Sequence, residues 1–260
     1  MPCEAPISAQ QILTECPRMT PDDCFTFRCG PDLDCFGDCC RDVTIVLTPY
    51  DVLRMRRALH MDSSEFLEKH TLRPTFPGQK FPIVILRMDD EGKQCPFVSE
   101  RGCGIYEDRP WACRMYPLGA AEPKTPTPDE HAFHFVVREN LCHGHGKGCQ
   151  VSVRDWTVRQ GAEDYEMMSG GFKELTLHGF WDGDKELTPQ QADMFYMACY
   201  DLDRFRRFVF ETRFLQLFDV DEARVEALRN DDEELLEFGM QWLRFAIFGE
   251  RSLRLRRDRQ

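Results

Sequence analysis

The sequence predicts an α+β fold: an irregular, cysteine-rich region with a few short antiparallel strands, followed by a mainly helical C-terminal region. Three observations lead to this prediction. Nine of the thirteen cysteines lie between residues 29 and 149. Short runs rich in β-branched residues, which are typical of strands, fall in the same part of the chain. After about residue 150, apolar residues instead recur at helical spacing.

Local signals place the elements of the first region. Residues 43–47 (VTIVL) predict a short strand. The Thr-Pro-Tyr-Asp motif at residues 48–51 combines an N-cap, a first-turn proline and a capping-box carboxylate, so a helix is expected to begin there. Further elements are expected at residues 63–67 (helix), 81–88 with 94–98 (hairpin), 103–118 (compact turn or short helix) and 132–138 (strand).

The helical region shows the same signals more strongly. Residues 153–168 read as helix, and residues 188–191 repeat the capping signature at the start of a long helix. Residues 231–248 predict a further amphipathic helix. One apolar stripe is expected on the long helix, formed by Phe195, Cys199, Leu202, Phe205 and Val209.

Composition divides the 260-residue chain into four parts. A flexible lead-in (1–23) precedes a cysteine-cluster domain (24–150). A helical region (151–250) and a basic tail (251–260) follow, and the tail is expected to be a disordered, solvated terminus.

Charge and hydropathy narrow the function classes. A formal net charge of −12 disfavours general binding to nucleic-acid backbones. No run approaches the roughly 20 apolar residues of a membrane helix, and the start of the chain lacks the features of a secretory signal. A cytoplasmic location is therefore expected, where thiols stay reduced and disulfides are an unusual use for cysteine.

The cysteines form three sets: the C-x5-C-x3-C-C cluster at residues 29–40, the set at residues 95–113, and the pair at residues 142 and 149. Thiolates are soft ligands that suit zinc and iron–sulfur clusters, and the neighbouring glycines permit the tight turns that converging sulfurs need. Chemistry alone leaves zinc and iron–sulfur equally open. The candidate metal ligands are Cys29, Cys35, Cys39, Cys40, Cys95, Cys103, Cys113, Cys142 and Cys149.

Nine sulfurs exceed the four that one structural zinc or one cubane cluster requires, so either some are bystanders or there are two metal centres. Cys199 on the helical stripe is expected in the core, and Cys3 and Cys16 in the lead-in are expected to be bystanders, whereas Cys24 stays open. His143 and His145 beside Cys142 leave a mixed Cys/His site open.

Two motifs carry a resemblance to a known family over about residues 27–150. The first is the segment CCRDVTIVLTPYD, which begins with the paired cysteines. The second is the segment CPFVSERGCGIYEDRPWACRMYP. Together they resemble the YkgJ cysteine-cluster family, described as a zinc- or iron-chelating domain. The resemblance implies that the seven cysteines from Cys29 to Cys113 bind metal as a set. It also implies that Asp108, Arg109, Pro110, Tyr116 and Pro117 shape the ligand turn.

The cysteine cluster is also similar to that of flagellin lysine N-methylase. That resemblance implies a 4Fe-4S cluster and methyl transfer from S-adenosylmethionine to a protein lysine. The chain shows no Gly-rich nucleotide loop after a strand. A third alternative is an interaction module, in which a metal braces the first region while residues 195–218 bind a protein partner.

Overall fold

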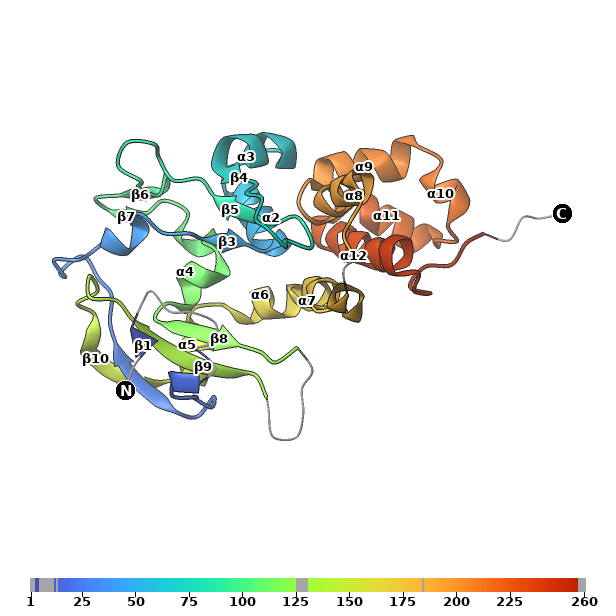
Figure 1. Cartoon of the computed structure of the whole chain (residues 1–260). Coiled ribbons are helices and arrows are strands. Elements are labelled where there is room, and N and C mark those ends of the chain that lie inside the picture. The colour runs from blue at the N-terminus through green and yellow to red at the C-terminus, as the bar shows by residue number, and fades with distance from the viewer. Residues whose placement is uncertain (1–2, 5–11, 13, 125–130, 184, 257–260) are drawn as a thin grey trace. The chain divides into compact units, whose positions relative to one another are not determined.

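The computed structural model describes residues 3–4, 12, 14–124, 131–183 and 185–256 (Figure 1). The chain divides into two compact units. We call Met1–Ile45 with Met88–Tyr165 the cysteine unit, and Val46–Arg87 with Glu166–Gln260 the helical unit. Each unit is described by itself.

Short strands organise the cysteine unit. β2 (Cys24–Phe27) pairs antiparallel with β10 (His145–Ser152), and the register shifts between His145 and Gln150. β9 (Phe133–Arg138) lies between β8 (Leu118–Ala121), which is antiparallel to it, and β1 (Cys3–Glu4), which is parallel. β6 (Val98–Ser99) and β7 (Gly102–Cys103) form a small hairpin.

Short helices complete this unit. They are the 3₁₀ helices η1 (Asp38–Cys40) and η2 (Tyr106–Asp108), then α4 (Trp111–Met115) and α5 (Val153–Arg159). The division between the units falls within α6 (Glu163–Met168). The main apolar cluster draws on β2, α4, β8, β10 and α5, and consists of Phe25, Phe27, Met115, Leu118, Val151, Val153 and Ala162.

The helical unit begins with a small antiparallel sheet in the order β3 (Val46–Leu47), β5 (Val84–Leu86), β4 (Thr71–Leu72). α2 (Pro49–Ala58) and α3 (Ser63–His70) lie between β3 and β4 in the sequence. The predicted capping box is present, because the Thr48 hydroxyl accepts from the Asp51 amide and the Asp51 carboxylate accepts from the Thr48 amide.

The remaining helices pack around the longest one, α12 (Asp232–Phe248), which contacts α7, α8, α9 and α11 (Figure 1). Phe205, Phe214, Phe238 and Trp242 form an aromatic cluster in this core and are all buried. The other elements are α7 (Gly170–Thr176), η3 (Gly179–Asp182), α8 (Pro189–Cys199), α9 (Leu202–Glu211), α10 (Phe214–Leu217) and α11 (Glu222–Asn230).

The predicted α+β architecture is confirmed, and two local predictions were wrong. The hairpin of 81–88 with 94–98 does not form, because β5 pairs with β3 and β4 while Val98 pairs with Cys103. The long helix breaks between α8 and α9, where Asp201 leaves helical geometry. Its buried carboxylate accepts hydrogen bonds from the Ser63 and Ser64 hydroxyls, which stabilise the break.

The structure also bears on the predicted apolar stripe and on the predicted basic tail. The apolar stripe is confirmed as core, since Phe195, Cys199, Phe205 and Val209 are fully buried. The first part of the basic tail is ordered, because Leu255 forms a β-bridge with Phe218. Arg257 and Arg259 lie outside the described residues. Within the described part of the chain, none of the helices has the length and apolar character needed to cross a bilayer.

Candidate metal centre

The segment that carries the first four cysteines is a run of tight turns. Backbone hydrogen bonds link Asp38 to Cys35 and Cys40 to Gly37, and the second of these closes the turn of η1. Gly37 has a φ of 90°, a left-handed conformation that glycine adopts readily. The turns make this segment compact.

A second segment, residues 139–144, lies against these turns. The His143 amide donates to the Cys35 sulfur at 3.2 Å, and the Arg28 amide donates to the Gly144 carbonyl at 3.1 Å. A Cβ at Gly144 would lie 2.4 Å from the Arg28 carbonyl oxygen, so the approach requires glycine. The contact places Cys142 beside the first cysteine cluster.

Four thiols share this environment, and we call Cys29, Cys35, Cys39 and Cys142 the first thiol group. Burial raises the pKa of the Cys29 thiol, and the neighbouring thiols of Cys39, Cys142 and Cys35 raise it further. Thiolates this close repel one another unless a cation lies between them. A cation bound among these thiols would remove this repulsion and favour their thiolate form.

Cys40 lies at the edge of this group. A hydrogen bond from the Cys39 thiol to the Cys40 sulfur is the main reason that the pKa of Cys39 is raised, followed by burial and by the charges of Cys40 and Glu139. The Cys40 carbonyl accepts from the Cys95 amide at 2.8 Å. Cys40 thus adjoins both the first thiol group and the segment that carries the next cysteines.

In the second set, Cys95 lies three residues before β6, Cys103 ends β7, and Cys113 lies on α4. Burial raises the pKa of Cys95, the backbone amides of Phe97 and Val98 partly offset this by hydrogen bonding to its sulfur, and the Cys103 thiol raises it again. Amides that donate to a sulfur stabilise its thiolate form. We call Cys95, Cys103 and Cys113 the second thiol group.

Two buried arginines adjoin the second thiol group. Burial lowers the pKa of Arg109, while the neighbouring Cys113 and Cys103 thiols act to raise it. Arg114 donates to the Arg109 carbonyl at 3.1 Å and to the Gln160 carbonyl at 2.6 Å. This pair holds the loop before α4 together, which agrees with the turn-shaping role that the resemblance implied for Arg109.

The hydrogen bonding of the Tyr116 hydroxyl indicates whether these residues fit a bound metal. Its hydroxyl is buried, and among the described residues it has no hydrogen-bonding partner. Burial raises the pKa of Tyr116, and the nearby Cys142 thiol is the next cause. A metal-bound Cys142 thiolate would accept the hydrogen bond that this hydroxyl lacks, so the donor set fits a metal-bound thiolate.

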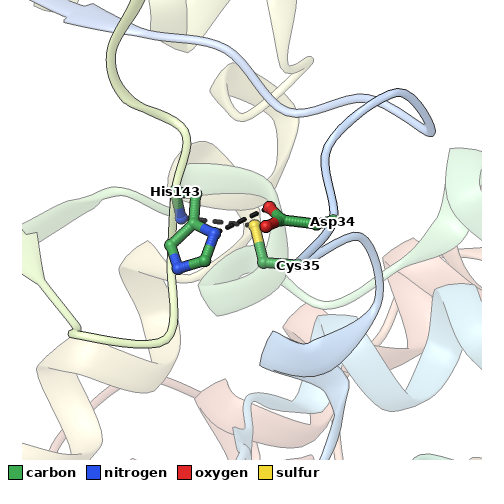
Figure 2. Close-up of side chains that lie close together, drawn as sticks. All are labelled: Asp34, Cys35 and His143. Atoms are coloured by element: carbon green, nitrogen blue, oxygen red, sulfur yellow. Dashed lines mark hydrogen bonds and ion pairs between the residues drawn. The ribbon is translucent and has the colours of Figure 1, made fainter.

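Sequence reasoning missed one neighbour of the first thiol group, Asp34. The Asp34 carboxylate hydrogen-bonds with the His143 imidazole at 2.7 Å, and this contact lowers the pKa of Asp34 (Figure 2). Among the described residues, Asp34, Cys35 and His143 form the group whose ligand atoms all lie within 4.8 Å of one another. Of these two residues, the sequence pointed only to His143, because it is next to Cys142.

The other candidates lie in different surroundings. His145 packs against the Phe27 ring, at 5.3 Å between centroids. Cys149 is exposed on β10, and Cys24 is exposed on β2. Cys16 is buried and disulfide-bonded, so it adds nothing to the pool of reduced thiols. The side chain of Cys3 lies outside the described part of the structure.

Residues 28–143 match the model of the CxxCxxCC family, whose description is "putative zinc- or iron-chelating domain". The match covers the first thiol group and the second, and it ends just after Cys142. It confirms the cysteine-cluster resemblance and supports zinc or iron chelation by this region. No curated protein and no solved structure matches the chain at a significant level.

Proposed function

We propose that this protein binds zinc or iron through cysteine thiolates drawn from the nine candidates between Cys29 and Cys149. One observation carries the proposal. Two segments separated by about a hundred residues, which carry Cys35 and Cys142, meet at a hydrogen bond from the His143 amide to the Cys35 sulfur. Such convergence is what a polydentate metal site requires.

The surroundings of these cysteines support the same proposal. Within residues 28–42 the buried apolar residues are Leu33 and Cys35, and within 93–108 the one such residue is Ile105, all of them described residues. So little apolar burial cannot offset the conformational entropy of ordering two loops. A metal bound by four thiolates can, because its binding free energy is also folding free energy.

Either zinc or a 4Fe-4S cluster can use four thiolates. Only the resemblance to flagellin lysine N-methylase supports the cluster and a methyl-transfer role with S-adenosylmethionine. The interaction-module alternative loses its support, since Phe195, Phe205, Phe214 and Phe218 are buried. We therefore propose metal binding as the function. The reduced thiols suit a cytoplasmic location, with the Cys16 disulfide as the exception.

Metal and acid-labile sulfide content, measured with a visible spectrum on full-length protein kept free of oxygen, tests the proposal. Stoichiometric zinc without colour identifies a zinc protein, and iron with equal sulfide and a brown chromophore identifies a cluster. Cys39→Ser and Cys113→Ser are expected to lower the metal content, whereas Cys24→Ser, at an exposed cysteine outside the nine candidates, is the matched control. Purified protein that holds neither metal, and takes up neither on reconstitution, contradicts the proposal.

A further inference from the structure

Asp34, Cys35 and His143 bring three different kinds of metal ligand to one point of the cysteine unit (Figure 2). Their ligand atoms are a carboxylate oxygen, a thiol sulfur and an imidazole nitrogen, and all lie within 4.8 Å of one another. Since only one of the three atoms is a sulfur, this group differs in kind from a centre made of four thiolates.

A tight turn presents two of the three ligands. The Phe36 amide donates to the Leu33 carbonyl at 3.0 Å, so Asp34 and Cys35 are the two central residues of a β-turn. Leu33 is buried and holds the turn against the protein. Figure 2 shows the side chains of Asp34 and Cys35 both directed toward His143. The fold thus orders two neighbouring ligands before any ion binds.

Backbone contacts fix the third ligand. The Arg28 amide donates to the Gly144 carbonyl at 3.1 Å, directly after His143, and the His143 amide donates to the Cys35 sulfur at 3.2 Å. A sulfur accepts a hydrogen bond weakly as a thiol and more strongly as a charged thiolate. The amide therefore suits the thiolate form of Cys35, which is the form that binds a metal.

The distances within the group fit zinc. The Asp34 carboxylate and the His143 Nδ1 atom are 2.7 Å apart. Oxygen and nitrogen ligands on a tetrahedral zinc ion lie roughly 3.3 Å apart, and a sulfur lies roughly 3.5 Å from each. The two side chains therefore need to separate by less than about 1 Å for zinc to replace the proton that they share. The sulfur, within 4.8 Å of both, needs to approach by no more than about 1.5 Å.

Charge and exposure fit a zinc ion as well. Zinc bound by one thiolate, one carboxylate and one neutral imidazole has no net charge, so the buried Cys35 sulfur needs no further countercharge. The side chains of Asp34 and His143 are 78% and 50% exposed. The sulfur thus lies at the base of the group and the other two ligands face solvent, which leaves a route of entry and a fourth coordination position for water.

A simple surface contact would explain only part of this arrangement. An exposed carboxylate and imidazole often pair without a metal, and such a pair contributes little to stability. It does not require a buried sulfur within reach of both side chains, nor a backbone amide that donates to that sulfur. A bound zinc ion accounts for all three features.

We propose that Asp34, Cys35 and His143 bind one zinc ion, with water as the fourth ligand. This inference rests on the proposed function in that Cys35 is one of the nine candidate thiols. It adds an oxygen ligand and a nitrogen ligand from outside the cysteines. It also makes this centre a single metal ion, since iron–sulfur clusters are held mainly by cysteine thiolates.

Zinc titration of the full chain, kept reduced and free of oxygen, tests the two added ligands. Native mass spectrometry counts the bound zinc, and competition with a chromophoric chelator measures its affinity. Asp34→Asn and His143→Gln are each expected to weaken one zinc equivalent by at least the roughly 10- to 100-fold that loss of an outer hydrogen-bonding partner costs. The matched controls Asp32→Asn and His131→Gln, at exposed residues of the same unit, should bind zinc as the wild-type protein does. Wild-type zinc number and affinity in both Asp34→Asn and His143→Gln overturn the inference.

A second measurement needs no variant. X-ray absorption at the zinc edge of the zinc-saturated wild-type protein is expected to show nitrogen or oxygen neighbours, including imidazole, at about 2.0–2.1 Å beside sulfur at about 2.3 Å. A shell of sulfur alone overturns the inference and leaves the proposed function standing, and so does a protein that takes up iron but no zinc. A protein that takes up neither metal defeats both.

Discussion

The helical unit and the cysteine-bearing loops of the cysteine unit are stabilised by different means. In the helical unit, Leu235, Phe238 and Leu243 on α12 are fully buried, and the aromatic cluster around Trp242 packs beside them. The loops at 28–42 and 93–108 bury almost no apolar side chains by comparison. One chain thus offsets conformational entropy by apolar burial in one region and, we propose, by metal–thiolate bonds in another.

The cysteine unit itself repeats this contrast on a smaller scale. Phe25, Phe27 and Val151 join β2 and β10 in an apolar cluster, against which Cys142 packs. Because this part has its own apolar core, we expect it to stay folded without metal and to hold the Cys142 sulfur in place. The turns that carry Cys29 to Cys40 bury only Leu33 and Cys35 among their apolar residues, so the effect of metal should be greatest there.

Metal removal should produce the largest effect. A structural zinc contributes on the order of 10 kcal/mol of apparent folding free energy, so the loops at 28–42 and 93–108 are expected to lose hydrogen-exchange protection when a chelator is added. Amides of α8 and α12 should keep theirs. Equal loss of protection in the loops and in these helices would show that the two regions do not differ as argued.

The second-largest effect should come from lowering the pH, which is expected to weaken metal binding. The raised pKa values of Cys29, Cys39 and Cys95 mean that these thiols are protonated at neutral pH and must release protons when they bind metal. Affinity should then fall by about tenfold per pH unit for each proton displaced. Competition titrations with a chromophoric chelator at about pH 6 and about pH 8 measure this slope, and a slope of zero contradicts thiol ligation.

A core substitution should affect the helical unit alone. Phe205 is fully buried and lies 5.6 Å from Trp242 between ring centroids, so Phe205→Ala is expected to lower the free energy of unfolding by about 3–5 kcal/mol. Metal content should stay at the wild-type value. The control Leu217→Ala, at a residue that is 58% exposed, should change stability by less than about 0.5 kcal/mol in urea unfolding.

The sequence predicted the helical unit better than the cysteine unit for a physical reason. Helix starts depend on neighbouring residues, and the capping boxes at Thr48 and Thr188 form as expected. The break after α8 could not be foreseen, because it depends on the Ser63 and Ser64 hydroxyls, which are far from Asp201 in sequence. Strand pairing likewise depends on distant segments, so the partners of β5 were assigned wrongly.

In the candidate site too, features set by neighbouring residues could be predicted from the sequence, and features set by distant segments could not. Cysteine spacing and family resemblance predicted which residues are ligand candidates, because short sequence motifs are enough to identify them. How they group could not be predicted, because the grouping depends on the contact of residues 139–144 with the first cluster. The hydrogen-bonding partner of His143, Asp34, has no distinguishing signal in a loop that is already rich in aspartate.

A glycine substitution tests how tightly the helices of the helical unit pack. A Cβ at Gly239 of α12 would lie 2.7 Å from the Ala198 carbonyl oxygen of α8, so Gly239→Ala should force the helices apart and destabilise the protein by about 1–3 kcal/mol. Gly170, at the start of α7, has open space around it, and Gly170→Ala should be neutral or slightly stabilising. Equal thermal melting of both variants would indicate that the α8–α12 contact is looser than described.

The smallest effect should come from one hydroxyl. Tyr116→Phe removes the buried group next to Cys142 but keeps the ring, which packs edge-on against Phe27 at 5.7 Å. Because the hydroxyl would donate to the metal-bound thiolate, its loss should weaken metal affinity by roughly tenfold. Tyr106→Phe, at an exposed ring stacked on Arg109, is the control and should bind metal as the wild-type protein does. Since Tyr116 Oη lacks a partner in the metal-free protein, Tyr116→Phe should leave that form as stable or more stable, and so separates a role in metal binding from one in packing.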